Sequence, residues 1–139
     1  MSAAEKIQFP KPEMLDLATL IPDPDNPNRM DDAQLKALEE SMKKFNWIGG
    51  PIITNKDLMI ADGHQRFMVA NKIGLKQVPV MVLDVDNVDR VLLQQIMNLL
   101  KGTHVKELQT NRLEYLAAHR DKESLALMLG QKKEVSPRS

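Results

Sequence analysis

Short apolar blocks of two different periods alternate along the 139-residue chain and predict an α/β domain. Residues 14–20 alternate apolar and polar side chains, and residues 77–86 are rich in β-branched side chains, so both segments are predicted strands. Two short apolar runs, "PIITN" and "LMIAD", predict a β-hairpin or two neighbouring strands. Pro79 favours an edge of the sheet or the start of its strand, because proline lacks a backbone N–H.

In most of the remaining chain, apolar residues recur at the spacing of an α-helix. A helix is predicted after the stiff, proline-rich loop "IPDPDNPNRM", because Asp31 and Gln34 form a capping-box pair there. A second helix is predicted over 63–73, with Gly74 as its stop. The apolar spacing then predicts a third helix over 88–101, another over 104–120 and a shorter one over 122–130.

These elements define the expected fold class, an α/β (α+β) domain with a small mixed sheet and a helical C-terminal extension. We expect a flexible arm over 1–13, the domain over 14–101, the extension over 102–130 and a disordered tail over 131–139. The extension holds more large apolar residues than a small sheet can cover. We therefore expect a homodimer through the C-terminal helices, with packing inside one chain as the alternative. These residues are Leu108, Leu116, Leu125, Met128 and Leu129.

Composition narrows the possible functions. The absence of cysteine excludes disulfides, thiolate zinc sites and cysteine nucleophiles. No run of about 18 apolar residues could span a membrane, and the first residues lack the pattern of a signal peptide, so we expect a cytoplasmic protein with no membrane partner. The 19 Lys and Arg residues against 19 Asp and Glu residues argue against a broad positive field for nucleic acid. A local basic patch that contacts DNA remains open, with a solvated surface as the alternative.

Candidate chemistry concentrates where a predicted strand meets a predicted helix, in "IADGHQRFMVANKIG". The N-terminus of a helix has unpaired N–H groups and the positive end of a dipole, and it binds anions such as phosphate. Gly63 would let the backbone approach a ligand, Arg66 could bind phosphate through two hydrogen bonds, and His64 could donate a proton or accept one. The alternative is structural, with a tight turn, a helix cap and a surface ion pair.

Four motifs, "NPNRM", "GGPIIT", "DGHQR" and "VPVMVLD", follow one another along the chain. In this order and at these intervals they resemble the ParB/sulfiredoxin superfamily over about residues 14–101. The resemblance implies a fold of that kind that binds a nucleoside triphosphate or diphosphate, CTP or ATP/ADP, with Mg²⁺. Asp62 would lie at the mouth of the site, within reach of a metal ion or a substrate hydroxyl. The implied nucleotide contacts are Gly63, His64, Gln65, Arg66, Asn26, Asn28, Arg29 and Asn98.

Departures from the family patterns narrow the function. Sulfiredoxins carry a catalytic cysteine at the position of His64, so a chain without cysteine cannot perform their reaction. Partition ParB proteins have Gly-Glu-Arg-Arg at the corner and a Glu-Asn pair in the next helix. Here the pair corresponds to Met97-Asn98, and the lost acid weakens the case for metal-assisted CTP hydrolysis. Residues 102–139 are too few for the DNA-binding and dimerisation domains of those proteins, so we do not expect a complete partition protein.

Two other branches of the superfamily are similar at the corner. Free-serine kinases have Asp-Gly-His-His-Arg there, and such a phosphotransferase would use Asp25 or Asp62 as base and His64 to stabilise the transferring phosphoryl group. The stand-alone ParB-like domains of phages and mobile elements share "NPN" loops and a helical tail. We therefore expect a nucleotide-binding module that is DNA-associated or regulatory. The alternatives are a kinase-like phosphotransferase, a nuclease, for which no convincing metal-binding acids are found, or an interaction module with a vestigial pocket.

Overall fold

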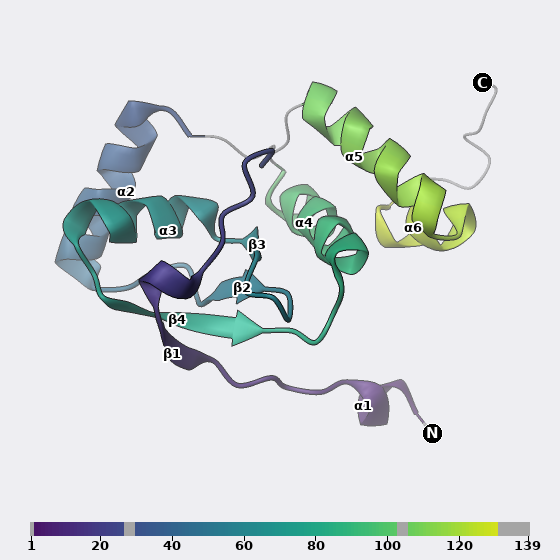
Figure 1. Cartoon of the computed structure of the whole chain (residues 1–139), viewed down its shortest axis with the longest axis horizontal. Coiled ribbons are helices and arrows are strands. Elements are labelled where there is room, and N and C mark those ends of the chain that lie inside the picture. The colour runs from purple at the N-terminus through teal and green to yellow at the C-terminus, as the bar shows by residue number, and fades with distance from the viewer. Residues whose placement is uncertain (1, 27–29, 103–105, 131–139) are drawn as a thin grey trace.

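The computed structural model describes residues 2–26, 30–102 and 106–130, with 106–111 described by their backbone alone. Within these residues, four strands form one mixed sheet in the order β1-β4-β2-β3 (Figure 1). β4 runs parallel to β2, whereas β1 pairs antiparallel with β4 and β3 pairs antiparallel with β2. The bounds are Glu13–Asp16 for β1, Ile52–Thr54 for β2, Ile60–Asp62 for β3 and Gln77–Val82 for β4. The predicted small mixed sheet is confirmed.

Two strands are shorter than predicted. β1 ends at Asp16, because a 3₁₀ turn over Leu17–Thr19 (η1) follows and buries its first side chain in the core. β4 also stops short, at Val82. Pro79 lies in an inner strand, so the predicted edge position is wrong for β4 as a whole. The pairing with β2 begins only at Val80, however, so the proline itself is flanked by β1 alone.

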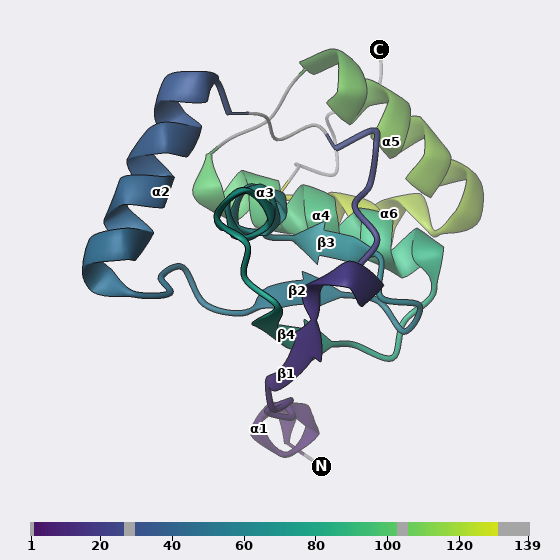
Figure 2. The same cartoon turned by 60° about the vertical axis from the view of Figure 1, so that its left-hand side comes forward.

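Six helices accompany the sheet in the described part of the chain. Their bounds are Ala3–Lys6 for α1, Asp32–Phe45 for α2, His64–Ile73 for α3, Asn87–Lys101 for α4, Lys106–His119 for α5 and Lys122–Met128 for α6. The capping box before α2 forms as predicted, with the Asp31 carboxylate accepting from the N–H of Gln34 at 2.8 Å. α3 ends at Gly74, also as predicted. Figures 1 and 2 show α2 and α3 on one side of the molecule and α4 between the sheet and the α5–α6 pair.

Two apolar clusters hold these elements together. The first fills the space between the sheet and α3 and consists of Leu17, Leu20, Ile52, Ile60, Ala70, Val78 and Val80. The second lies where α4 meets the extension and consists of Val91, Leu92, Leu116, Leu125 and Leu129. α4 therefore turns an apolar face to α5 and α6, and its other face meets β3.

The extension covers much of its apolar surface within the chain. Leu116, Leu125 and Leu129 are buried, Met128 is 47% exposed, and the side chain of Leu108 lies outside the described residues. Packing inside one chain thus accounts for three of the residues behind the expected homodimer, which stays a prediction.

The domain boundaries also stay predictions: α1 falls in the expected arm, and 131–139 lie outside the described residues. No helix in the described part of the chain is long and apolar enough to cross a membrane.

Candidate functional site

The strand-to-helix corner forms where the sequence predicts it. β3 ends at Asp62, Gly63 is the N-cap with φ of +103°, and α3 begins at His64. No side chain caps the first turn, so its N–H groups remain oriented towards a ligand position at the helix end. A Cβ on Gly63 would lie 3.0 Å from Arg66 Nη2 and 3.2 Å from Ile52 Cγ1. Glycine is therefore needed here for its backbone angle and for the side chains packed beneath it.

Arg66 lies beneath the corner. Its side chain is 10% exposed, and its Nη2 donates to the carbonyl of Pro51 at 3.0 Å and lies 3.6 Å from Asp62 Oδ2. Its buried Nε has no hydrogen-bond partner among the described residues. A Cβ on Gly49 would come within 3.0 Å of its Cδ, so the side chain is held between two glycine turns. Arg66 thus braces the corner and supplies positive charge, while direct contact with a phosphate stays a prediction.

His64 is buried and neutral. Its Nε2 accepts the N–H of Asp23 at 3.0 Å, which leaves the ring proton on Nδ1. Burial lowers the pKa of His64 to about 4, and the positive charges of Arg90 and Arg112 add to this effect against the opposing carboxylates. At neutral pH the ring is therefore a hydrogen-bond donor through Nδ1, and its Nε2 lone pair is already occupied. This arrangement favours a role in binding over the role in catalysis considered from the sequence.

Asp62 is buried, with 6% of the residue exposed, and its place at the mouth of the site stays a prediction. Oδ1 forms an ion pair with Lys101 of α4, and Oδ2 lies 3.6 Å from Arg66. Both carboxylate oxygens are therefore already engaged by cations. The other candidate base, Asp25, is exposed on the loop before α2.

The loop between η1 and α2 forms the wall opposite the corner. Asn26 is half-buried, and its Oδ1 lies 3.4 Å from Gln94 Nε2 of α4. Asn28 and Arg29 lie outside the described residues. A cavity of about 390 Å³ separates this loop from α3, and its lining includes Pro22, Asn26, Met30, His64, Gln65 and Met68. The structure therefore brings Asn26, His64 and Gln65 to one cavity, and their contact with a nucleotide stays a prediction.

α4 turns a row of buried polar side chains towards the sheet. Asn98, predicted from the resemblance, is 3% exposed, and Gln94 and Gln95 are each 1% exposed. Asn98 Nδ2, Gln94 Oε1 and both amide atoms of Gln95 have no hydrogen-bond partner among the described residues. Burying such groups costs free energy unless a ligand or water completes their bonds. The sequence reasoning missed Arg90, Gln94 and Gln95, although the polar positions 90, 94, 98 and 101 recur at helical spacing in an otherwise apolar helix.

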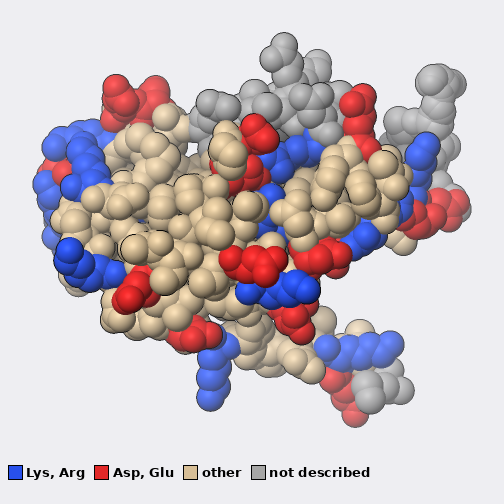
Figure 3. All heavy atoms as spheres, in the orientation of Figure 1, with Lys and Arg blue, Asp and Glu red and all other residues tan. Residues whose placement is uncertain are grey.

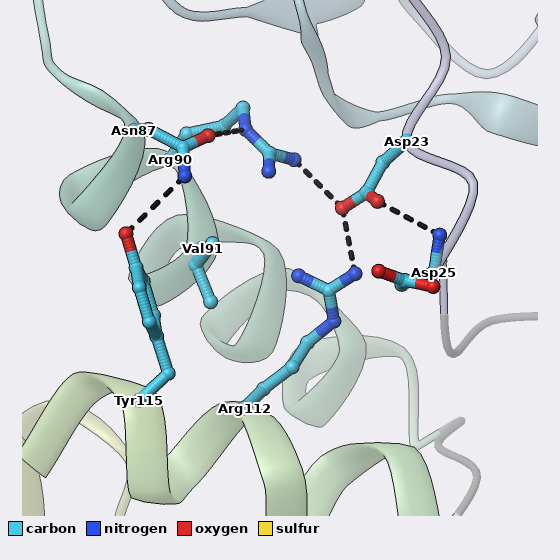
Figure 4. Close-up of a pocket in the computed structure, with 7 residues that line it drawn as sticks. All are labelled: Asp23, Asp25, Asn87, Arg90, Val91, Arg112 and Tyr115. Carbon is cyan, nitrogen blue, oxygen red and sulfur yellow. Dashed lines mark hydrogen bonds and ion pairs between the residues drawn. The ribbon is translucent and has the colours of Figure 1, made fainter.

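Asp23 connects the loop to α4 and α5 (Figure 4). Its Oδ2 accepts from Arg90 Nη1 at 3.0 Å and from Arg112 Nη2 at 2.7 Å, and its Oδ1 accepts the N–H of Asp25. Burial acts to raise the pKa of Asp23, but that N–H and the two arginines outweigh burial, and the pKa lies below its usual value. The carboxylate is charged at neutral pH. Since its own N–H binds His64, this residue links the corner, α4 and the extension.

The two buried carboxylates each have two cationic partners. Asp62 pairs with Lys101 and Arg66, and Asp23 pairs with Arg90 and Arg112. In the described part of the chain, these ion pairs bring four cations to two carboxylates, although the whole chain has equal numbers of acidic and basic residues. Arginine and lysine side chains gathered in this way favour an anionic ligand. Among the described residues, no group of three or more His, Asp or Glu side chains is placed to hold a metal ion.

Comparisons with known proteins bear on the family and the fold of this chain. The family model of the ParB N-terminal domain matches residues 1–99. The solved structure of a pNOB8-like ParB-N domain is similar with a TM-score of 0.62 and 18% identity, and the match covers 86% of this chain and 49% of that one. This chain thus spans about half the length of that protein.

Two structures of the C-terminally truncated chromosome-partitioning protein ParB from Caulobacter crescentus are also similar, each with 22% identity. The complex with CTP-gamma-S has a TM-score of 0.57 and is covered over 72% of its length by 87% of this chain. The complex with the centromeric parS site has a TM-score of 0.60, and the match covers 88% of this chain and 66% of that one. A comparison with curated proteins finds no match. The family match extends over most of the chain, and the chain therefore belongs to the ParB N-terminal domain family.

Proposed function

We propose that this chain binds a nucleoside phosphate, with CTP as the first candidate, between the loop before α2, the Gly63 corner and the polar face of α4. The observation that carries the proposal is the start of α3 at Gly63, which no side chain caps, with the cations Arg66 and Lys101 held by Asp62 beside it. A polyphosphate is attracted to these cations and accepts hydrogen bonds from a helix N-terminus. The complex of the Caulobacter protein with CTP-gamma-S supports CTP as the first nucleotide to test.

Each part of the proposed site has a separate task. The backbone N–H groups at the start of α3 would bind phosphate oxygens, and the Nδ1–H of His64 would donate beside them. Lys101 and the amide of Asn98 lie on the α4 side and would contact the same phosphates. The cavity beside Asn26 would hold the nucleoside. The protein offers Mg²⁺ no cluster of ligands among its described residues, so the proposal does not depend on the ion.

Binding without turnover fits the side chains better than phosphotransfer does. A kinase-like reaction needs a base with a free lone pair near the substrate hydroxyl. Asp62 is paired with two cations, and His64 Nε2 already accepts a hydrogen bond. On the face shown in Figure 3, Lys and Arg side chains are interspersed with Asp and Glu side chains, and this mixture gives DNA no broad basic surface there. Nucleotide is accordingly the ligand proposed here.

Calorimetric titration tests the proposal. CTP, ATP, GTP and ADP are titrated with and without Mg²⁺ into the full chain and into Lys101→Gln, which removes one positive charge beside Asp62. Lys76→Gln, on an exposed lysine beyond the other end of α3, is the matched control. We expect saturable binding of one nucleotide that weakens by about tenfold in Lys101→Gln and not in the control, since one lost charge contact is worth about 1.4 kcal/mol. No binding of any nucleotide would refute the proposal and leave an interaction module with a vestigial pocket.

A further inference from the structure

A second cavity, of about 400 Å³, lies where the loop before α2 meets α4 and α5 (Figure 4). The cavity beside Asn26 is lined by side chains of α3, whereas the second cavity is lined by side chains of α4 and α5. Asp23 lines both cavities. Arg90 and Arg112 lie on either side of Asp23, and Asn87 and Tyr115 form the wall that faces them. The cavity therefore combines two guanidinium groups with one phenol at the contact between the domain and its extension.

Several donors around this cavity have no acceptor among the described residues. Arg90 donates through Nε to Asn87 and through Nη1 to Asp23 and the carbonyl of Ile60, and its Nη2 has no partner among the described residues. Arg112 donates from Nη2 to Asp23, while its Nε and Nη1 have no partner in the same part of the chain. The Tyr115 oxygen accepts from Asn87 at 3.3 Å, so its own O–H proton remains for another acceptor.

The charged side chains that line the cavity are two arginines and two aspartates. Arg90 is 3% exposed and Arg112 is 9% exposed, and both are paired with the buried Asp23. Asp25 stands exposed at the rim, and no hydrogen bond or ion pair joins its side chain to either arginine in the described structure. The two guanidinium groups thus share one buried carboxylate and keep unused donors, which is an environment for an anion.

We propose that this cavity is a second binding site, for a small ligand that carries a carboxylate or phosphate group. The anion accepts hydrogen bonds from Arg112, Arg90 and the Tyr115 hydroxyl. The guanidinium groups come from two helices, so the bound anion also joins α5 of the extension to α4. The site uses none of the corner groups Gly63 to Arg66, although Asp23 lines both this cavity and the one proposed for the nucleoside.

NMR of the arginine Nε–H groups tests this site directly. The ¹⁵N-labelled full chain is titrated with inorganic phosphate and, separately, with malonate, at constant ionic strength set by sodium chloride. We expect saturable shifts of the Nε–H signals of Arg90 and Arg112 with at least one of the two anions. Phosphate and malonate separate the two classes of anion, and CTP added in a third titration shows whether the corner amides respond independently.

Two variants and a matched control keep the test decisive. Tyr115→Phe removes one hydroxyl and raises the dissociation constant by about tenfold or more, the value of one hydrogen bond to a charged group. Arg112→Gln abolishes the saturable shift of Arg90, whereas Arg120→Gln, which removes an equal charge just beyond α5, leaves it unchanged. Absence of saturable shifts with both anions overturns the proposal. Shifts that are confined to the amides of residues 63–66, or that persist in Arg112→Gln, place the anion elsewhere and overturn it as well.

Discussion

The buried state of His64 predicts a specific loss of stability in mild acid. Its pKa is lowered from 6.5 to about 4 in the folded chain, so the unfolded chain binds a proton at this position more readily. The contribution of His64 to stability is fully present above pH 6.5 and is lost as the pH falls from 6.5 to about 4. Each pKa unit is worth about 1.4 kcal/mol, so the loss over this window is on the order of 3 kcal/mol.

Urea denaturation at a series of pH values between 7 and 4 measures this loss, with His64→Gln as the comparison. Glutamine is neutral at every pH, and its Oε1 can accept the N–H of Asp23 in place of the imidazole nitrogen. Carboxylates with lowered pKa values, such as Asp86, also lose stability in acid, but they do so equally in both proteins. The difference between the two curves should grow by about 3 kcal/mol on acidification. Parallel curves would refute the assignment of a buried, neutral His64.

Two further substitutions test the groups that support the site. Asp23→Asn should lower the free energy of unfolding at pH 7 by about 3–5 kcal/mol in urea denaturation, because it leaves two buried guanidinium groups without a counter-charge. The control Asp25→Asn, at an exposed position, should change this free energy by less than about 0.5 kcal/mol. Equal effects of the two substitutions would contradict the pairing of Asp23 with Arg90 and Arg112. Gly63→Ala and Gly50→Ala both place a side chain at positive φ, at a cost of about 1–2 kcal/mol. Only Gly63→Ala also crowds Arg66, so the thermal midpoint of this variant should fall further. Equal midpoints would show that Arg66 does not brace the corner.

Local sequence signals were sufficient to predict the corner. A short apolar run followed by glycine and a helical pattern gave the end of β3 and the bounds of α3 correctly, because a glycine in the left-handed region and a helix start are properties of neighbouring residues. The capping box before α2 is local in the same sense. By contrast, the end of β1 depends on η1, whose first side chain is drawn into a core made by distant strands.

The ion pairs could not be derived from local patterns. Asp23 and Arg112 are 89 positions apart and meet only because α5 packs on α4 beside the loop. From the sequence, Asp23 is one of two aspartates in the proline-rich loop and Arg112 one of many cations in the second half of the chain. The same applies to Asp62, whose partner Lys101 lies 39 positions away. Pairing over such distances changes a predicted base into a buried counter-charge, and only the folded chain shows which cations it meets.

The polar stripe of α4 is the signal that sequence reasoning could have used and did not. Gln94 and Gln95 are buried, and Gln94 Oε1 and both amide atoms of Gln95 have no partner among the described residues, which is unexpected in a helix chosen only for packing. The spacing of Gln94 and Gln95 with Asn98 places all three on one side of the helix. A ligand bound there would offer hydrogen-bond acceptors and donors to their amide groups. A neutral chain can therefore still contain a positive site, because the balance of charges over the whole sequence says nothing about which of them are buried together.

Chemical-shift mapping of CTP on the ¹⁵N-labelled chain tests the central claim most directly. If the nucleotide binds where proposed, the amide signals of His64, Gln65 and Arg66 shift first and saturate together with the side-chain amide of Asn98. Saturable shifts that leave these signals unchanged, or no saturable shift at any CTP concentration, would contradict the account.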